Sequence, residues 1–231
     1  MKKRGFTLAE VLITLGIIGV VAAMTIPTLI TNYQKRVYVV KLQKAMSVLN
    51  NGFKLMMAEE GVEYFDHLSL STCRDEGLNV IGADETERAC IHEKMSKYFK
   101  IIDYNKDSDY EDETFYPFKS LKTLSGESTN ALFGMFAVAA YYYSFVTTDN
   151  ILYQPFSITW SVIDVNGKDG PNQLGRDLFM ITHDDRGHFT FQGTNGGWET
   201  ESSVQYCDDA LTGDGQGCGA RIQAEGWKMN Y

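Results

Sequence analysis

The sequence lacks the short motifs by which many enzyme active sites are recognised. It has no Gly-rich phosphate loop, no H-E-x-x-H zinc motif and no G-x-S-x-G nucleophile elbow. None of its four cysteines forms a C-x-x-C pair, so a zinc ribbon or a thioredoxin-like redox site has no support. His183 and His188 flank a turn, and we interpret them as surface imidazoles rather than as a shared metal site. The sequence therefore predicts a protein that is not an enzyme and has no cofactor, apart from the calcium considered below.

The body of the chain also lacks an excess of positive charge. The formal net charge is −9, with 21 Lys and Arg residues against 30 Asp and Glu residues. Three of these basic residues, Lys2, Lys3 and Arg4, precede Gly5, so the chain after them carries −9 minus 3, or −12. An acidic surface repels phosphate backbones, so general nucleic-acid binding is not expected.

Charged side chains are almost absent from Phe6 to Ile30, where Glu10 is the one exception. A helix of this length rises about 37 Å, enough to cross a hydrocarbon core of about 30 Å. The preceding basic residues are expected to stay in the cytoplasm, so the rest of the chain lies across the membrane. Two alternatives are a secretory signal peptide cut near Ala23 and a plain signal anchor. Both leave Glu10 unexplained, because an ionised carboxylate in an apolar segment costs on the order of several kcal/mol.

A known family offers an explanation for Glu10. The segment Gly5-Phe6-Thr7-Leu8-Ala9-Glu10, followed by a long apolar helix with Pro27 at its far end, strongly resembles the N-terminus of type IV prepilins. This family includes pilins, minor pilins and the pseudopilins of type II secretion. The resemblance implies that prepilin peptidase removes the leader, residues 1–5, by cleaving between Gly5 and Phe6. It also implies N-methylation of Phe6.

The resemblance further implies that Glu10 serves assembly. A buried carboxylate needs an opposite charge, and in the pilin family the N-terminal amine of a neighbouring subunit supplies it. The alternative for an unassembled subunit is a Glu10 that is kept protonated in the membrane. The implied partners are prepilin peptidase, other pilin-like subunits of a filament, and the inner, or cytoplasmic, membrane. The chain would be a single-pass membrane protein first and part of an extracytoplasmic filament later.

Small residues recur along the apolar stretch. Ala9, Gly16 and Ala23 lie seven positions apart, and Gly19 lies beside them. Small residues let helices approach closely in a membrane or a filament core, although glycine is common in single spans as well. Pro27 removes a backbone donor and clashes with the carbonyl four residues earlier, so we expect a kink there. The resemblance adds that the stretch between the glycines and Pro27 can locally unwind on assembly.

The pattern after the apolar stretch predicts an α+β fold. Apolar residues from Tyr38 to Met56 recur at steps of three and four, so one helix is expected to run from Phe6 to near Met57. Its first half, residues 6–30, is the membrane or filament-core segment, and residues 31–59 are its amphipathic half. A second helix is expected from Glu85 to Asp103. The apolar run from 131 to 146 is too short for a second span, and we interpret it as buried structure.

Strands are expected in the last third of the chain. β-branched and aromatic residues alternate with turn signals there, at Tyr141–Thr147, Ile151–Gln154, Ser157–Val165, Asp177–Thr182 and His188–Phe191. The predicted head, residues 60–231, is thus an antiparallel sheet laid on the amphipathic half of the first helix, and the pilin family has this architecture.

One loop is rich in oxygen-bearing side chains. The segment from Asp164 to Asp177 resembles a Gly/Asp/Asn loop of many pseudopilin-like proteins, and Asp164, Asn166 and Asp169 could hold calcium through hard oxygen ligands. The spacing is not that of an EF-hand. We favour the alternative, a turn whose side chains cap the backbone.

The four cysteines favour disulfides if the head is exported, because an oxidising compartment permits them. Four cysteines allow three pairings. Pairing Cys73 with Cys90 and Cys207 with Cys218 closes the shortest loops, which cost the least entropy. Four reduced cysteines are the alternative.

These observations predict a structural subunit of a type IV pilus-like or type II secretion pseudopilus filament, assembled through its N-terminal helix. The alternative is a minor pilin at the filament tip, whose head acts as a binding module for a surface, DNA or an exported protein.

Overall fold

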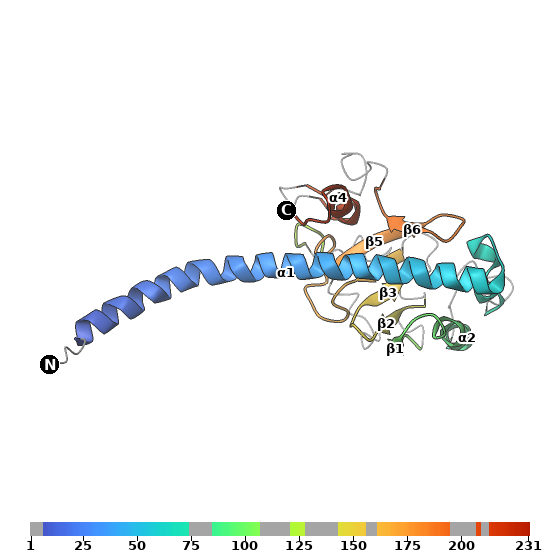
Figure 1. The fold of residues 1–231 in the computed structure, drawn as a ribbon, viewed down its shortest axis with the longest axis horizontal. Helices are drawn as coiled ribbons and strands as arrows, with labels where there is room; N and C mark the ends of the chain where they lie inside the picture. Colours follow the sequence, from blue (N-terminus) through green and yellow to red (C-terminus); the bar gives the residue numbers. More distant parts are fainter. Residues whose placement is uncertain are drawn as a thin grey trace, which may run out of the picture. The chain divides into compact units, whose positions relative to one another are not determined.

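The structure is a computed structural model, and it describes residues 7–73, 85–106, 121–127, 143–155, 161–194, 207–208 and 213–231. The chain divides into two compact units, Met1–Val37 and Tyr38–Tyr231, which we describe separately. One helix, α1 (Leu8–Glu60), contains residues of both units (Figure 1). The expected long N-terminal helix is confirmed within the described residues.

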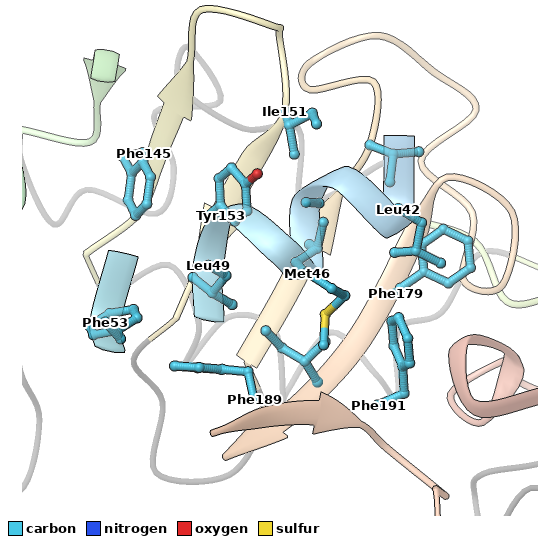
Figure 2. Close-up of a cluster of buried hydrophobic side chains, with 14 of the residues drawn as sticks. Leu42, Met46, Leu49, Phe53, Phe145, Ile151, Tyr153, Phe179, Phe189 and Phe191 are labelled. Carbon is cyan, nitrogen blue, oxygen red and sulfur yellow. The ribbon is translucent and has the colours of Figure 1, made fainter. Parts of the chain in front are cut away.

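The part of α1 that belongs to the second unit is amphipathic. Its buried residues follow one another at steps of three and four, with occasional neighbours, and are Val39, Leu42, Ala45, Met46, Leu49, Gly52, Phe53, Met56 and Met57. This spacing places one apolar stripe along a helix, which a sheet can cover. The predicted amphipathic pattern is therefore present, and its stripe forms one side of the hydrophobic core (Figure 2).

The other side of the core is a six-stranded antiparallel sheet in which each strand pairs with the next along the chain. The strands are β1 (Ile101–Tyr104), β2 (Phe145–Thr147), β3 (Leu152–Gln154), β4 (Ser161–Asp164), β5 (Leu178–His183) and β6 (Phe189–Phe191). This meander confirms the predicted α+β fold.

The register of the sheet gathers large apolar side chains on the face that meets α1. Phe145 lies opposite Tyr153, Tyr153 opposite Ile163, and Ile163 opposite Phe179, so the four form one row across β2 to β5. All four are buried in the core cluster that also holds the apolar stripe of α1. Because side chains alternate between the two faces of a strand, a slip of one residue in any pair would turn this row away from the helix.

The predicted second helix is shorter than expected. Helix α2 spans Glu85–Met95, and the chain then turns and enters β1, so the expectation of a helix to Asp103 was wrong. Ile101 pairs with Thr147 of β2, and Ile102 is largely exposed rather than on a buried helix face. β-branched residues fit a pleated strand well, and pairing with β2 outweighs the local helical spacing. The predicted buried run at 131–146 lies mostly outside the described residues.

Three further short helices lie in the described part of the second unit. They are the 3₁₀ turns η1 (Phe65–His67) and η2 (Ser69–Cys73), and α4 (Cys218–Ala224). The expected turns at Asp149-Asn150 and at residues 185–187 are both present. Asn150 and Gly187 adopt positive φ there, of 56° and 69°.

A side chain of α1 closes one edge of the sheet. Asn50 accepts a hydrogen bond from the backbone N–H of Phe189 at 2.8 Å and donates one to the carbonyl of the same residue at 3.1 Å. Among the described strands β6 lies at the edge of the sheet, so this amide occupies the place that a further strand would take at Phe189. An unpaired edge invites pairing with other chains, and Asn50 removes that opportunity at one residue.

Candidate functional site

The first turn of α1 carries a capping box. Thr7 precedes the helix, and its Oγ1 accepts a hydrogen bond from the backbone N–H of Glu10 at 3.3 Å. The Glu10 carboxylate in turn accepts from the Thr7 backbone N–H and from the Thr7 hydroxyl, both at 2.8 Å. This reciprocal arrangement satisfies backbone donors that a helix start leaves open, and the positive end of the helix dipole favours the carboxylate.

The apolar side chains that follow Glu10 are exposed. They include Leu8, Val11, Leu12, Ile13, Leu15, Ile17, Ile18, Val20, Val21, Met24, Ile26, Leu29 and Ile30. In the described part of the chain, α1 is the one helix that is long and apolar enough to cross a membrane. A contiguous apolar surface of this size marks a membrane or protein interaction site. The first unit therefore carries an apolar surface suited to lipid or to other helices.

Three threonine hydroxyls on or next to this segment are satisfied by the helix itself. Thr14, Thr25 and Thr31 each donate to a backbone carbonyl four residues earlier, at 2.9, 3.0 and 3.0 Å. Such bonds remove polar groups that would be costly in an apolar environment. These three hydroxyls are therefore paired within α1, and the carboxylate of Glu10, which Thr7 caps, is the one formal charge of the segment.

The glycines of the segment leave open surface. A Cβ atom added at Gly16 or Gly19 would meet no atom within 4 Å. Close approach of a second helix is easiest at such positions. Helix α1 is continuous through Pro27, and the kink and the unwinding predicted there remain predictions. Gly5 and Phe6, the predicted cleavage pair, lie outside the described residues.

The structure places the predicted calcium ligands in turn-capping roles. Asp164 Oδ1 accepts from the Asn166 backbone N–H at 3.1 Å, and the Asn166 amide donates to the Gly170 carbonyl at 2.9 Å. Asn150 donates to the Asn166 carbonyl at 2.8 Å and to Asp169 Oδ2 at 3.4 Å. Within the described ranges, no group of three His, Cys, Asp or Glu residues is arranged to hold a metal. These bonds are of the kind that a turn with capping side chains makes, and the calcium site stays a prediction.

The two histidines that flank the predicted turn both contact Asp184. The His183 ring packs against Phe65, with ring centroids 4.4 Å apart, and its Nδ1 lies 3.1 Å from the Asp184 carbonyl. His188 is exposed and donates its backbone N–H to Asp184 Oδ1. His183 is thus half-buried against an aromatic ring, whereas His188 is exposed.

Two disulfides join the cysteines in the local pairing. Cys73 bonds Cys90 and Cys207 bonds Cys218, with Cα–Cα distances of 5.6 and 5.0 Å. The first bond ties η2 to α2, and the second ties residue 207 to the start of α4. Disulfides persist in oxidising compartments, so this pattern is typical of an exported domain.

Sequence reasoning assigned Glu10 to assembly and overlooked its local role. The signal was present, because Thr-x-x-Glu immediately before an apolar run is the sequence signature of a capping box. The edge-closing role of Asn50 had no such signal, since its partner Phe189 lies 139 positions away in the chain.

A comparison with known protein families gives a match at the N-terminus. A family model described as the prokaryotic N-terminal methylation motif matches residues 1–26. No curated protein and no solved structure matches the chain. The first 26 residues are therefore a prepilin segment of the type IV pilin kind, which marks a precursor of pilin or pseudopilin type.

Proposed function

We propose that this prepilin-type chain is a structural subunit of a type IV pilus-like or type II secretion pseudopilus filament. Prepilin peptidase removes residues 1–5, and Phe6 then carries a methylated N-terminal amine. Residues 6–30 hold the precursor in the cytoplasmic membrane as a single span, with residues 60–231 outside the cytoplasm. The same helix later packs among those of other pilin-like subunits. The match at residues 1–26 supports the processing step in particular.

One observation carries the assembly proposal. The exposed apolar segment contains a single charged side chain, Glu10, on its first turn, and that carboxylate is exposed. Water no longer solvates a charge once helices pack around it, so the carboxylate needs a cation on a neighbouring subunit. The processed N-terminus of a neighbour supplies an amine of the required sign. Open surface at Gly16 and Gly19 supports close packing of the helices that bring the two groups together.

The two disulfides support the proposed orientation. Both lie in the second unit, and the three basic residues of the leader lie at the opposite end of the apolar segment. Positive residues flanking a span stay in the cytoplasm, whereas disulfides form on the oxidising side. Both features therefore favour a head outside the cytoplasm.

The capping box provides a sharp test of the charge of Glu10. Glu10→Gln keeps a side chain that can cap the helix start but cannot pair with an amine. In a filament this change would leave the amine of the neighbouring subunit buried without a partner, which costs about 3–5 kcal/mol. We therefore expect Glu10→Gln to be processed and held in the membrane but absent from filaments. Incorporation is measured by shearing filaments from cells that express the matching assembly machine and quantifying the subunit.

Glu93→Ala is the matched control, because Glu93 is an exposed glutamate of α2 in the second unit. It should incorporate as well as the unmodified chain. Thr7→Ala removes the capping hydroxyl and keeps the charge, so it separates helix capping from pairing. If Glu10→Gln enters filaments as well as Glu93→Ala does, the proposed ion pair is wrong.

A further inference from the structure

A groove of about 380 Å³ lies on the second unit between α1, β6 and the end of α4, and we call it the α1–β6 groove. Among the residues that the structure describes, the groove is lined by one face of α1, by strand β6 with the residue before it, and by two residues at or just after the end of α4. These residues are Gln43, Met46, Ser47, Asn50, Asn51, His188, Phe189, Thr190, Phe191, Gln223 and Trp227. Grooves of this volume are in the range that binds small ligands.

The chemistry of this lining is polar without being charged. No Lys, Arg, Asp or Glu is among the described lining residues, although such residues make up 22% of the sequence. Three of the lining residues, Met46, Phe189 and Phe191, are buried and apolar. The more exposed positions carry amides, hydroxyls and an imidazole. A phosphate, a carboxylate or an ammonium group would find no opposite full charge on this lining.

Three amides are available to a ligand. Asn50 is engaged with Phe189, whereas the amides of Gln43, Asn51 and Gln223 have no side-chain hydrogen-bond partner within the part of the chain that the structure describes. Each amide presents donors and an acceptor side by side. Neighbouring hydroxyls of a sugar ring present the complementary pattern, because each hydroxyl both donates and accepts.

Trp227 contributes an aromatic side chain to the lining of the groove. Helix α4 ends in a Schellman arrangement, in which Gly226 N–H donates to the Gln223 carbonyl at 3.2 Å and Trp227 N–H donates to the Ile222 carbonyl at 2.8 Å. The Trp227 ring packs edge-on against Phe191, with centroids 5.9 Å apart.

The backbone of Trp227 is also unusual. Its φ is 61°, in the left-handed region that bulky residues rarely adopt. Residues held in such conformations cluster at ligand clamps and other functional sites. The Schellman bonds fix the backbone of Trp227, and its ring contacts Phe191 in the groove that the free amides also line.

We propose that the α1–β6 groove binds a neutral saccharide. The indole of Trp227 offers a flat apolar face to the C–H side of a sugar ring, and the free amides hydrogen-bond its hydroxyls. The uncharged lining disfavours nucleic acids, which are recognised through basic side chains. The described lining also has no Lys, Arg, Asp or Glu that could form ion pairs with a charged peptide. The inference does not depend on filament assembly, since every residue it uses belongs to the second unit.

The test uses the full chain in a detergent without a sugar head group, because a glycosidic detergent would compete for the groove. Isothermal titration calorimetry is carried out with the neutral hexasaccharides of β-1,4-glucose, α-1,4-glucose and β-1,4-N-acetylglucosamine. Oligogalacturonate and a single-stranded DNA oligonucleotide are the charged comparators. We expect at least one neutral hexasaccharide to bind with a Kd of about 1 mM or tighter, and the comparators to show no binding.

Variants locate the binding. Asn51→Ala and Gln223→Ala replace exposed side chains, and each is expected to weaken binding roughly fivefold, as for one lost hydrogen bond. Gln34→Ala makes the same chemical change at an exposed position of α1 in the first unit and should leave the Kd unchanged. Trp227→Phe keeps an aromatic ring of smaller area and should weaken binding as well.

Three outcomes would overturn the proposal. They are no binding of any neutral hexasaccharide up to about 10 mM, binding that the groove variants leave unchanged, and binding of a charged comparator that the groove variants weaken. Thermal unfolding of each variant shows whether it is folded. The chain is studied unassembled in this test. Failure of the saccharide proposal would therefore leave the filament proposal intact.

Discussion

Replacing Asn50 should weaken the second unit by removing its closure of the sheet edge. Asn50→Ala deletes both hydrogen bonds to the Phe189 backbone, at 2.8 and 3.1 Å, in a partly buried site. Each such bond contributes about 1 kcal/mol net, and Ala gains back roughly 0.5 kcal/mol in helix propensity. The expected loss is therefore about 1.5 kcal/mol, or a decrease in Tm of roughly 3–6 °C for a domain of this size.

Differential scanning calorimetry of the full chain in detergent measures this effect. Asn51→Ala is the matched control, because the neighbouring residue is exposed and the same change there alters only helix propensity. Asn50→Asp adds a second test. Its carboxylate would face the Phe189 carbonyl, so its pKa should rise in the folded state, and stability should be kept at low pH and lost as the pH rises. Equal Tm values for Asn50→Ala and Asn51→Ala would refute the edge-closing role.

Three further predictions concern the second unit. Burial raises the pKa of Asp214 to about 6. Between about pH 4 and pH 6 the folded state therefore binds more protons than the unfolded state, and stability falls as pH rises through that window. Asp214→Asn should flatten this dependence in thermal melts, because an amide can bond Gln216 without titrating; an unchanged slope would count against the assignment. Replacing Cys207 and Cys218 together by Ala should cost about 3 kcal/mol for an 11-residue loop, and non-reducing peptide mapping should find those two peptides joined; freely alkylated thiols would contradict it. Excess calcium should leave the Tm unchanged if the loop that begins at Asp164 is only a turn, and a rise in Tm would restore the ion site.

Much of the fold follows from local patterns in the sequence. The segment from Phe6 to Ile30, with Glu10 as its one charged residue, and the apolar spacing after Tyr38 suffice to predict α1, because both patterns extend over many helical turns. The strands follow from short runs of β-branched and aromatic residues between turn signals. Once export is expected, loop length favours the local cysteine pairing, since short loops close at the lowest entropic cost.

The errors and omissions share a physical cause. At Ile102 the local spacing suits a helix, but the pairing of β1 with β2, some 45 residues later in the chain, decides the structure. Asn50 reads as an ordinary polar position of a helix until the fold brings Phe189 beside it. The groove that includes Trp227 likewise combines residues from three separate stretches of sequence. Contacts between distant segments depend on the tertiary fold, and a single sequence carries little signal for them.

The central claim is that the chain is a prepilin that is trimmed at its N-terminus before assembly. The most direct test is the intact mass of the protein extracted from membranes of a host that contains prepilin peptidase, compared with a host that lacks the enzyme. The account predicts loss of residues 1–5 and one added methyl group on Phe6 in the first host, and a chain that still carries its leader in the second. A mature protein that begins at Met24 in either host would contradict the account, because it would identify a secretory signal peptide instead.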